Sequence, residues 1–236
     1  MSALIAASLV FLGLHLVVAG TRLRDAITGA IGERAYLGLF ALASLGGIVW
    51  MVAAYNAAFP GPENYVVYDL GAGVRHLGVP VLAIAFLLGI PGLFLPNPTA
   101  ALSEDTIGRA DLVKGVIAIT RHPFLWGVAI WAGFHLAANG DAASIVFFGA
   151  FLLLALAGTA SIDAKRRRKL GERWTDFAAK TSNVPFVAVL GGRARLAAIE
   201  LFDWRMAIAA AAFLGVLFAH AWVFSASPFP TGWVPF

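Results

Sequence analysis

Cysteine is absent from the sequence, and charged residues are scarce. The missing thiols exclude disulfides, iron–sulfur clusters, thiolate-ligated haem, the Cys-x-x-Cys-His attachment of c-type haem and a cysteine nucleophile. Only 13% of the 236 residues are charged whereas 60% are hydrophobic, so the polar surface is too small to cover a water-soluble globule. The composition therefore predicts an integral membrane protein. Its formal charge of +4 is assigned to membrane topology rather than to nucleic-acid binding.

Six apolar windows are long enough to form membrane-spanning helices, since about 20 helical residues cross a hydrocarbon core of roughly 30 Å. They cover residues 2–20, 35–59, 77–95, 123–139, 142–162 and 206–227, and none contains Asp, Glu, Lys or Arg. The sequence thus predicts an all-α polytopic membrane bundle of about six transmembrane helices, in a single domain over residues 1–236. The first window lacks the positively charged start of a signal peptide and is expected to be a retained helix.

Basic residues set the predicted orientation, because short loops rich in Lys and Arg stay on the cytoplasmic side. All but one of the 17 Lys and Arg residues follow the first, third or fifth window; the exception is Arg75. Both termini are therefore predicted to be periplasmic, in a bacterial inner membrane. The basic run 165–169 is expected to anchor on anionic lipid headgroups. Apolar residues at helical spacing predict an interfacial helix over 193–205.

The windows hold no carboxylate or amine, so an ion channel or a proton-coupled transporter would have few groups to use. Histidine is the one ionisable residue type with a charge change near neutral pH that the windows contain. His15, His135 and His220 lie inside windows, and His76 and His122 stand at window ends. Two neutral imidazoles are the usual ligands of b-type haem in a helical bundle, so haem b is the predicted cofactor. Helical rise places His135 and His220 about 20 Å above the cytoplasmic edge and His15 about 9 Å, so depth does not choose the pair. For each histidine, hydrogen-bonded packing is the alternative.

Arg121 and His122 directly precede Pro123, which is suited to the first turn of a helix. Free backbone N–H groups at a helix start attract anions, so a carboxylate or phosphate held with Arg121 is expected there. Anchoring of the two side chains in lipid headgroups is the alternative. Aromatic residues in the windows would line a slot for a flat macrocycle or a polyene, although bilayer-facing packing explains them equally well.

Several short patterns occur together in the chain. They are Thr120-Arg121-His122-Pro123 with Trp126-Gly127, His135-Leu136, Ala138-Asn139-Gly140-Asp141, His15 with Gly20-Thr21-Arg22, Gly32-Glu33-Arg34, and Ser161-Ile162-Asp163 before the basic run. On these patterns the sequence resembles the NnrU family of integral membrane proteins, which is related to plant and cyanobacterial 15-cis-zeta-carotene isomerase. The resemblance is strongest over residues 8–180 and weak in the C-terminal window 206–227.

The resemblance implies a haem b protein in which His15 and His135 are the axial metal ligands. Further cofactor contacts are expected among Arg22, Arg24, Arg121 and His122. The isomerase relatives are thought to use ferrous haem to convert one cis double bond of a carotenoid to trans, so the implied substrate is an apolar small molecule. Their cysteine before the second histidine corresponds to Ala132, so a thiolate switch is not implied. Bacterial members are associated with nitric oxide and nitrite, so a redox role in denitrification fits as well.

Two further functions stay open at this point. Arg121-His122-Pro123 with the later stretch 163–177 is similar to membrane methyltransferases of the isoprenylcysteine and phospholipid type, which bind S-adenosylmethionine. Their usual paired acidic residues are here only Asp163 followed by Ala164. The third function is a non-catalytic haem sensor or assembly factor. Membrane lipid is an expected partner, nucleic acid is not, and the sequence leaves the oligomeric state open.

Overall fold

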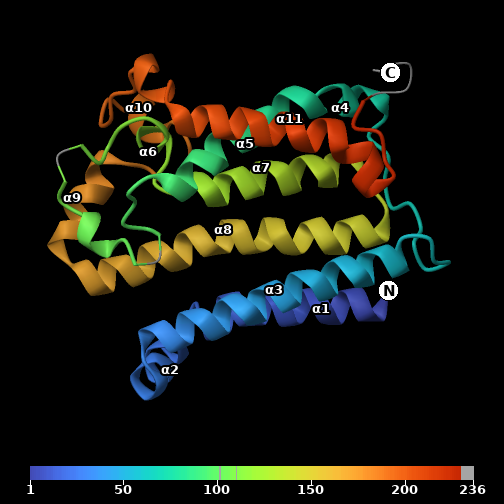
Figure 1. The fold of residues 1–236 in the computed structure, drawn as a ribbon, viewed down its shortest axis with the longest axis horizontal. Helices are drawn as coiled ribbons and strands as arrows, with labels where there is room; N and C mark the ends of the chain where they lie inside the picture. The colour runs from blue at the N-terminus through green and yellow to red at the C-terminus, as the bar shows by residue number, and fades with distance from the viewer. Residues whose placement is uncertain (101, 110, 230–236) are drawn as a thin grey trace. The chain divides into compact units, whose positions relative to one another are not determined.

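The computed structural model describes residues 1–100, 102–109 and 111–229, and its elements are helical (Figure 1). Within those ranges the β pairing consists of one isolated bridge between Val66 and Asp141. The all-helical fold class predicted from the sequence is therefore confirmed. The chain divides into two compact units, residues 1–71 with 132–161 and residues 72–131 with 162–236. Helices α7 (Pro123–Ala138) and α8 (Ala142–Leu170) contribute residues to both units.

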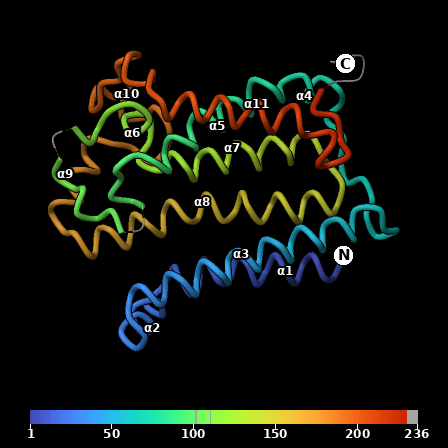
Figure 2. Tube along the Cα trace, viewed as in Figure 1, coloured from blue at the N-terminus to red at the C-terminus, as the bar shows by residue number. Residues whose placement is uncertain are grey.

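The first unit begins with α1 (Ser2–Gly13), which continues as the π-helical turn η1 (Leu14–Val18) and is followed by α2 (Leu23–Ile31) and α3 (Glu33–Ala58). The chain bends by 78° between η1 and α2 (Figure 2). Gly20 lies in this bend, where an added Cβ would come within 2.1 Å of the Leu16 carbonyl oxygen. Only glycine fits such a close backbone approach, so this residue makes the bend possible.

The second unit contains the remaining helices and the two ends of α7 and α8 that belong to it. They are α4 (Ala72–His76), α5 (Gly78–Phe94), η2 (Glu104–Thr106), α6 (Val116–Ile119), α9 (Glu172–Lys180), α10 (Val187–Leu190), η3 (Ala198–Leu201) and α11 (Trp204–Phe224). Glycines let α5 and α7 approach closely, because a Cβ on Gly127 would lie 2.7 Å from the Cα of Gly89. Ring contact between Phe86 and Phe213, with centroids 5.7 Å apart, ties α5 to α11.

Among the residues that the structure describes, α3, α8 and α11 are long and apolar enough to cross a membrane. A fourth span results if α1 with η1 and the bent α2 count as one broken span. Helices α5 and α7 are apolar but shorter, at 17 and 16 residues. Each of the six predicted windows thus contains a helix, and three or four of these helices satisfy the length of a span. Their apolar composition fits a membrane protein.

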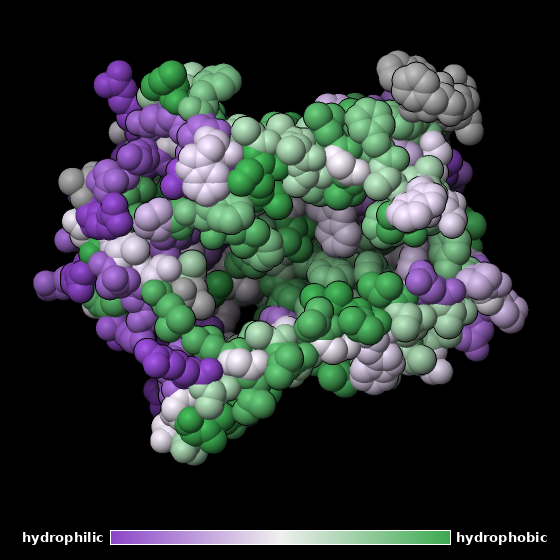
Figure 3. Space-filling view, viewed as in Figure 1, coloured by the Kyte–Doolittle hydropathy of each residue, from purple (hydrophilic) through white to green (hydrophobic). Residues whose placement is uncertain are grey.

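The predicted interfacial helix over 193–205 is wrong, because this segment contains the short 3₁₀ turn η3 and only the first two residues of α11. Gly191 and Gly192 follow α10, and Gly192 has a φ of +67°, which favours glycine and stops a helix. The Arg193 side chain then donates to the carbonyls of Ala179 and Thr181, both at 3.0 Å. Figure 3 shows hydrophilic side chains gathered around α9 and α10, and a hydrophobic surface along α11.

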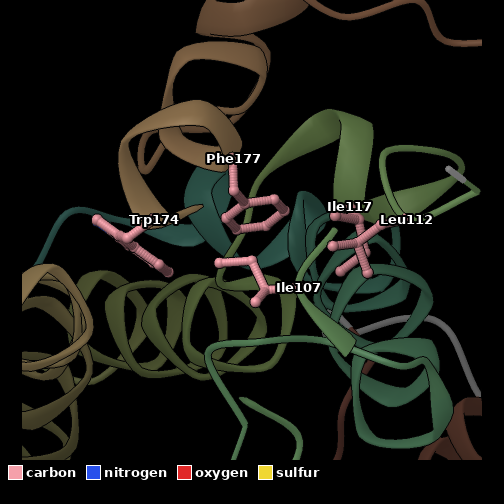
Figure 4. Packing of buried hydrophobic residues seen from close by; sticks show 5 residues of the cluster. All are labelled: Ile107, Leu112, Ile117, Trp174 and Phe177. Carbon is pink, nitrogen blue, oxygen red and sulfur yellow. The ribbon is translucent and has the colours of Figure 1, made fainter. Parts of the chain in front are cut away.

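A buried apolar cluster holds α9 against the segment that precedes α7 in the second unit (Figure 4). Its members are Ile107, Leu112, Ile117, Trp174 and Phe177. Figure 4 shows Trp174 and Phe177 reaching from α9 toward Ile107. Burying a large apolar side chain contributes roughly 1.5–3 kcal/mol, so these residues fix the polar end of the unit. The basic run 165–169 continues α8 as helix, and both Arg166 and Lys169 pair with Glu104.

Candidate functional site

His15 lies in the π-helical turn η1, a local widening of the helix that is frequent at functional sites. Its ring atom Nδ1 is 2.8 Å from the carbonyl oxygen of Phe11. Because a carbonyl only accepts, Nδ1 carries the proton and Nε2 keeps its lone pair. The hydroxyl of Ser44 on α3 lies 3.4 Å from Nε2 and is the donor of that long contact. This tautomer is the one that a metal-binding histidine needs.

Aromatic rings connect His15 with His135 inside the first unit. The His15 ring contacts Phe11 at 4.4 Å between centroids, and Phe11 contacts Phe151 at 5.5 Å. Phe147 continues this series from Phe151, at 5.2 Å. The two candidate ligands therefore belong to one compact unit and share an apolar aromatic surface.

His135 lies near the carboxyl end of α7 and stacks on Phe148 of α8, with centroids 4.7 Å apart and planes at 23°. The last turn of α7 is held from outside the helix. Asn139 donates its backbone N–H and its side-chain amide to the His135 carbonyl, each at 2.9 Å. The Tyr68 hydroxyl donates to the carbonyl of Leu136. These bonds satisfy carbonyls that a helix end leaves without partners, and so fix the turn that carries His135.

Arg121, His122 and Asp163 form a polar cluster in the second unit. The Arg121 guanidinium donates to both carboxylate oxygens of Asp163, from Nε to Oδ1 at 3.0 Å and from Nη2 to Oδ2 at 2.5 Å. The Nε2 atom of His122 is 2.7 Å from Oδ1 of the same carboxylate. Trp174 lies under the guanidinium, 5.8 Å from ring centroid to Cζ. Arg121 and His122, directly before α7, thus both bond to Asp163, which lies 42 and 41 residues further along the chain.

Backbone and side-chain bonds position this cluster. The Arg121 carbonyl accepts from Asn97 and from the Thr99 hydroxyl, both at 3.0 Å. The Arg121 N–H donates to the Ser182 carbonyl at 2.9 Å. Burial lowers the pKa of His122 below its ordinary value of 6.5, and the hydrogen bond and charge of Asp163 only partly offset that effect. His122 is therefore neutral at pH 7 and donates to Asp163 from Nε2.

The remaining sequence candidates lie elsewhere. Arg24 of α2 pairs with Glu33 and lies over the ring of Tyr36, while Arg22 is the residue that precedes α2. His76 and His220 belong to the second unit and each place Nδ1 2.8 Å from a backbone carbonyl, of Ala72 and of Ala226. The structure thus brings His15 and His135 into one unit, and Arg121 and His122 into the other.

Sequence reasoning missed several residues that shape these sites. Ser44 and Phe40 contact His15 from α3, and Asp163 bonds both Arg121 and His122. Helical spacing of Tyr36, Phe40 and Ser44, each four residues apart, was the available signal for a shared face toward α1. A lone acidic residue directly after the uncharged window 142–162 was the signal for Asp163.

The fold and the sites define an all-helical protein with membrane-type apolar helices and two polar centres among them. The chain belongs to the NnrU family, because the family model described as NnrU protein matches residues 3–228. It is 26% identical over 215 residues to the chloroplastic 15-cis-zeta-carotene isomerase of Zea mays, covering 89% of this chain and 58% of the relative. The same named protein of Arabidopsis thaliana is 26% identical over 172 residues, covering 72% of this chain and 46% of the relative. The chain spans about half the length of these curated relatives, and no solved structure shows a significant match.

The residues of the first unit fit a haem b group. Within the described ranges no group of three or more His, Asp or Glu side chains is placed to hold a metal ion, whereas a porphyrin iron needs only one or two protein ligands. His15 supplies a nitrogen in the required tautomer. The surrounding phenylalanines are suited to an apolar macrocycle.

Proposed function

We propose that this protein binds haem b through His15 and His135 and catalyses cis-to-trans isomerisation of a double bond in a carotenoid-type polyene. The state of His15 carries the proposal, because its Nδ1 proton is bonded to the Phe11 carbonyl and its Nε2 lone pair accepts only the long 3.4 Å contact from Ser44, which iron would replace. The names of the two plant relatives supply the reaction class. The π-helical turn at His15 supports the same assignment, because such turns are frequent at functional sites.

The reaction needs no acid or base from the protein. Haem bound in the ferrous state would supply an iron that can take electron density from a conjugated polyene, which would lower the barrier to rotation about its double bond. His15 and His135 would hold the group, and the phenylalanines packed around them would exclude water and contact its apolar faces. A reaction in which the cofactor supplies the chemistry and the protein supplies ligands and an apolar environment suits windows without carboxylates.

The same proposal includes six membrane spans with both termini on the periplasmic side of a bacterial inner membrane. The helices found in all six windows and the one-sided distribution of Lys and Arg support it. At 1.5 Å per residue, α5 and α7 are about 25 Å long. A shortfall of a few ångström is tolerated by local thinning of the bilayer.

The second unit gives less support to binding of S-adenosylmethionine. Arg121 and His122 are the groups that would contact the carboxylate and adenosine side of that cofactor. Both already donate to Asp163 at 3.1 Å or less, and their side chains are 11% and 1% exposed. The cluster therefore serves the packing of α7 against α8 in this unit better than it serves a ligand.

Optical spectra of the detergent-purified protein, oxidised and then reduced, test the cofactor and its ligands. We expect a Soret band that is lost or shifted in His15→Ala and in His135→Ala. The matched control is His220→Ala, an in-window histidine of the second unit, which should keep the wild-type spectrum. A Soret band that persists unchanged in both ligand variants would refute the assignment.

Turnover is tested by incubating the reduced, haem-loaded protein with 15-cis-zeta-carotene and following the 15-cis bond by chromatography. We expect loss of the 15-cis isomer with wild type and not with His15→Ala. Unchanged substrate would refute the isomerase. A spectrum that responds to nitric oxide without any turnover would instead support a redox or sensing role.

A further inference from the structure

Tyr36 of α3 carries a buried hydroxyl without a hydrogen-bond partner. The residue is only 4% exposed, and its Oη atom makes no hydrogen bond within the part of the chain that the structure describes. Buried side-chain polar groups in native proteins are nearly always bonded to protein, water or ligand. An orphaned hydroxyl near a candidate cofactor site therefore indicates a group that the protein binds.

The hydroxyl belongs to the helix face that meets His15. Tyr36, Phe40 and Ser44 are spaced by four residues and lie on one side of α3. The Phe40 ring contacts His15 at 5.1 Å between centroids, and the Tyr36 ring stacks on Phe40 at 5.8 Å with planes at 21°. Ser44 reaches Nε2 of His15. Tyr36 is thus two helical turns, about 12 Å, from Ser44, toward the start of α3.

Two charged groups lie near the Tyr36 side chain. The Arg24 guanidinium lies over the Tyr36 ring, 5.4 Å from Cζ to the centroid, and it pairs with Glu33 at the start of α3. A guanidinium has five N–H donors, of which the ion pair with Glu33 uses one. Arg24 therefore keeps donors for a second acceptor, and it offsets the negative charge of Glu33 there.

We propose that the Tyr36 hydroxyl and the Arg24 guanidinium bind a carboxylate of the ligand whose iron His15 holds, namely one propionate of haem b. This inference rests on the proposed function. Tyr36 supplies a neutral donor and Arg24 a charged donor, which is the pairing that a carboxylate at the edge of an apolar pocket requires. Along α3, Ser44 lies beside the proposed iron ligand His15, Phe40 presents an aromatic ring and Tyr36 a hydroxyl. This order matches the iron, the macrocycle and the propionate of haem.

A comparison of two pigments tests the carboxylate contact. Haem-free protein is titrated with iron protoporphyrin IX and with its dimethyl ester, which has the same macrocycle and no free carboxylate. We expect wild type to bind the free acid between about 10-fold and about 100-fold more tightly than the ester, the range for one hydrogen bond to a charged group. Tyr36→Phe and Arg24→Gln should each reduce this preference several-fold and leave the affinity for the ester unchanged.

Tyr55→Phe is the matched control, because Tyr55 lies on the same helix and its hydroxyl is bonded to Ser144 at 3.0 Å. It should keep the full preference for the free acid. Thermal unfolding of the haem-free proteins separates binding from folding. Tyr36→Phe should be as stable as wild type or more stable, because it removes an unpaired hydroxyl, whereas Tyr55→Phe should be less stable.

Equal affinity of wild type for the two pigments would overturn the inference and leave the proposed function standing. An undiminished preference in Tyr36→Phe would overturn the role of Tyr36 in the same way. Failure of wild type to bind either pigment would overturn both the proposed function and the inference.

Discussion

Asparagine in place of Asp163 should destabilise the second unit by about 3–5 kcal/mol, the range for breaking a buried ion pair. The carboxylate accepts from Arg121 through both of its oxygens and from His122 through one. The side chains of Arg121 and Asp163 are only 11% and 13% exposed. Solvent therefore screens the pair little, and the neutral amide leaves a buried guanidinium without its counter-charge.

Thermal unfolding in detergent measures this effect. For a chain of this size, 1 kcal/mol lowers the Tm by about 2–4 °C, so Asp163→Asn should lower it by roughly 6–20 °C. The matched control is Asp111→Asn, whose partner Arg109 lies at 3.3 Å in an ion pair that is about half exposed. Exposed pairs contribute about 0–1 kcal/mol, so this control should unfold within a few degrees of wild type.

Equal Tm values for Asp163→Asn and Asp111→Asn would refute the reasoning, because the buried pair would then contribute no more than an exposed one. A second test replaces both partners. If unpaired charge causes the loss, Arg121→Met combined with Asp163→Leu should recover much of the stability lost in Asp163→Asn.

Two other predictions concern single residues. Because burial lowers the pKa of His122, the unfolded chain binds the proton more readily than the folded chain. The stability of the protein should therefore fall as the pH drops below about 6.5. Tm measured between about pH 8 and pH 5 should show this slope in wild type and not in His122→Gln. Gly20→Ala places a Cβ 2.1 Å from the Leu16 carbonyl oxygen and should cost about 2 kcal/mol or more, whereas Gly13→Ala, with nothing within 4 Å, should be neutral or stabilising in the same assay.

The positions of the helices were predictable because the signal is local. An uncharged apolar window is read along the chain without reference to any other segment, and every window predicted in this way contains a helix. The same reasoning failed over 193–205, where the side chain of Arg193 donates to the carbonyls of Ala179, in the last turn of α9, and of Thr181, directly after it. Helical spacing of apolar residues carried no information on those distant acceptors.

The candidate sites show the same limit. Histidine content pointed to His15, His135 and His220, since an imidazole in hydrocarbon needs a partner, and the family resemblance then implied His15 and His135. Which atom becomes the partner depends on residues far along the chain, such as Ser44 for His15 and Asp163 for His122. The π-helical turn at His15 also has no signature in composition, because its 14–18 segment is as apolar as the helix before it.

Hydrogen bonding, rather than depth, supports the proposed choice of His15 among the histidines. In His122 the Nε2 atom carries the proton and donates it to Asp163, and the residue is buried. In His15, His76 and His220 a backbone carbonyl accepts from Nδ1, so Nε2 carries the lone pair, which in His15 accepts a long 3.4 Å contact from Ser44. Of these three, only His15 belongs to the unit that also contains His135. The proposed pairing of His15 with His135 therefore rests on the hydrogen bond at Nδ1 of His15 and on the unit that the two residues share.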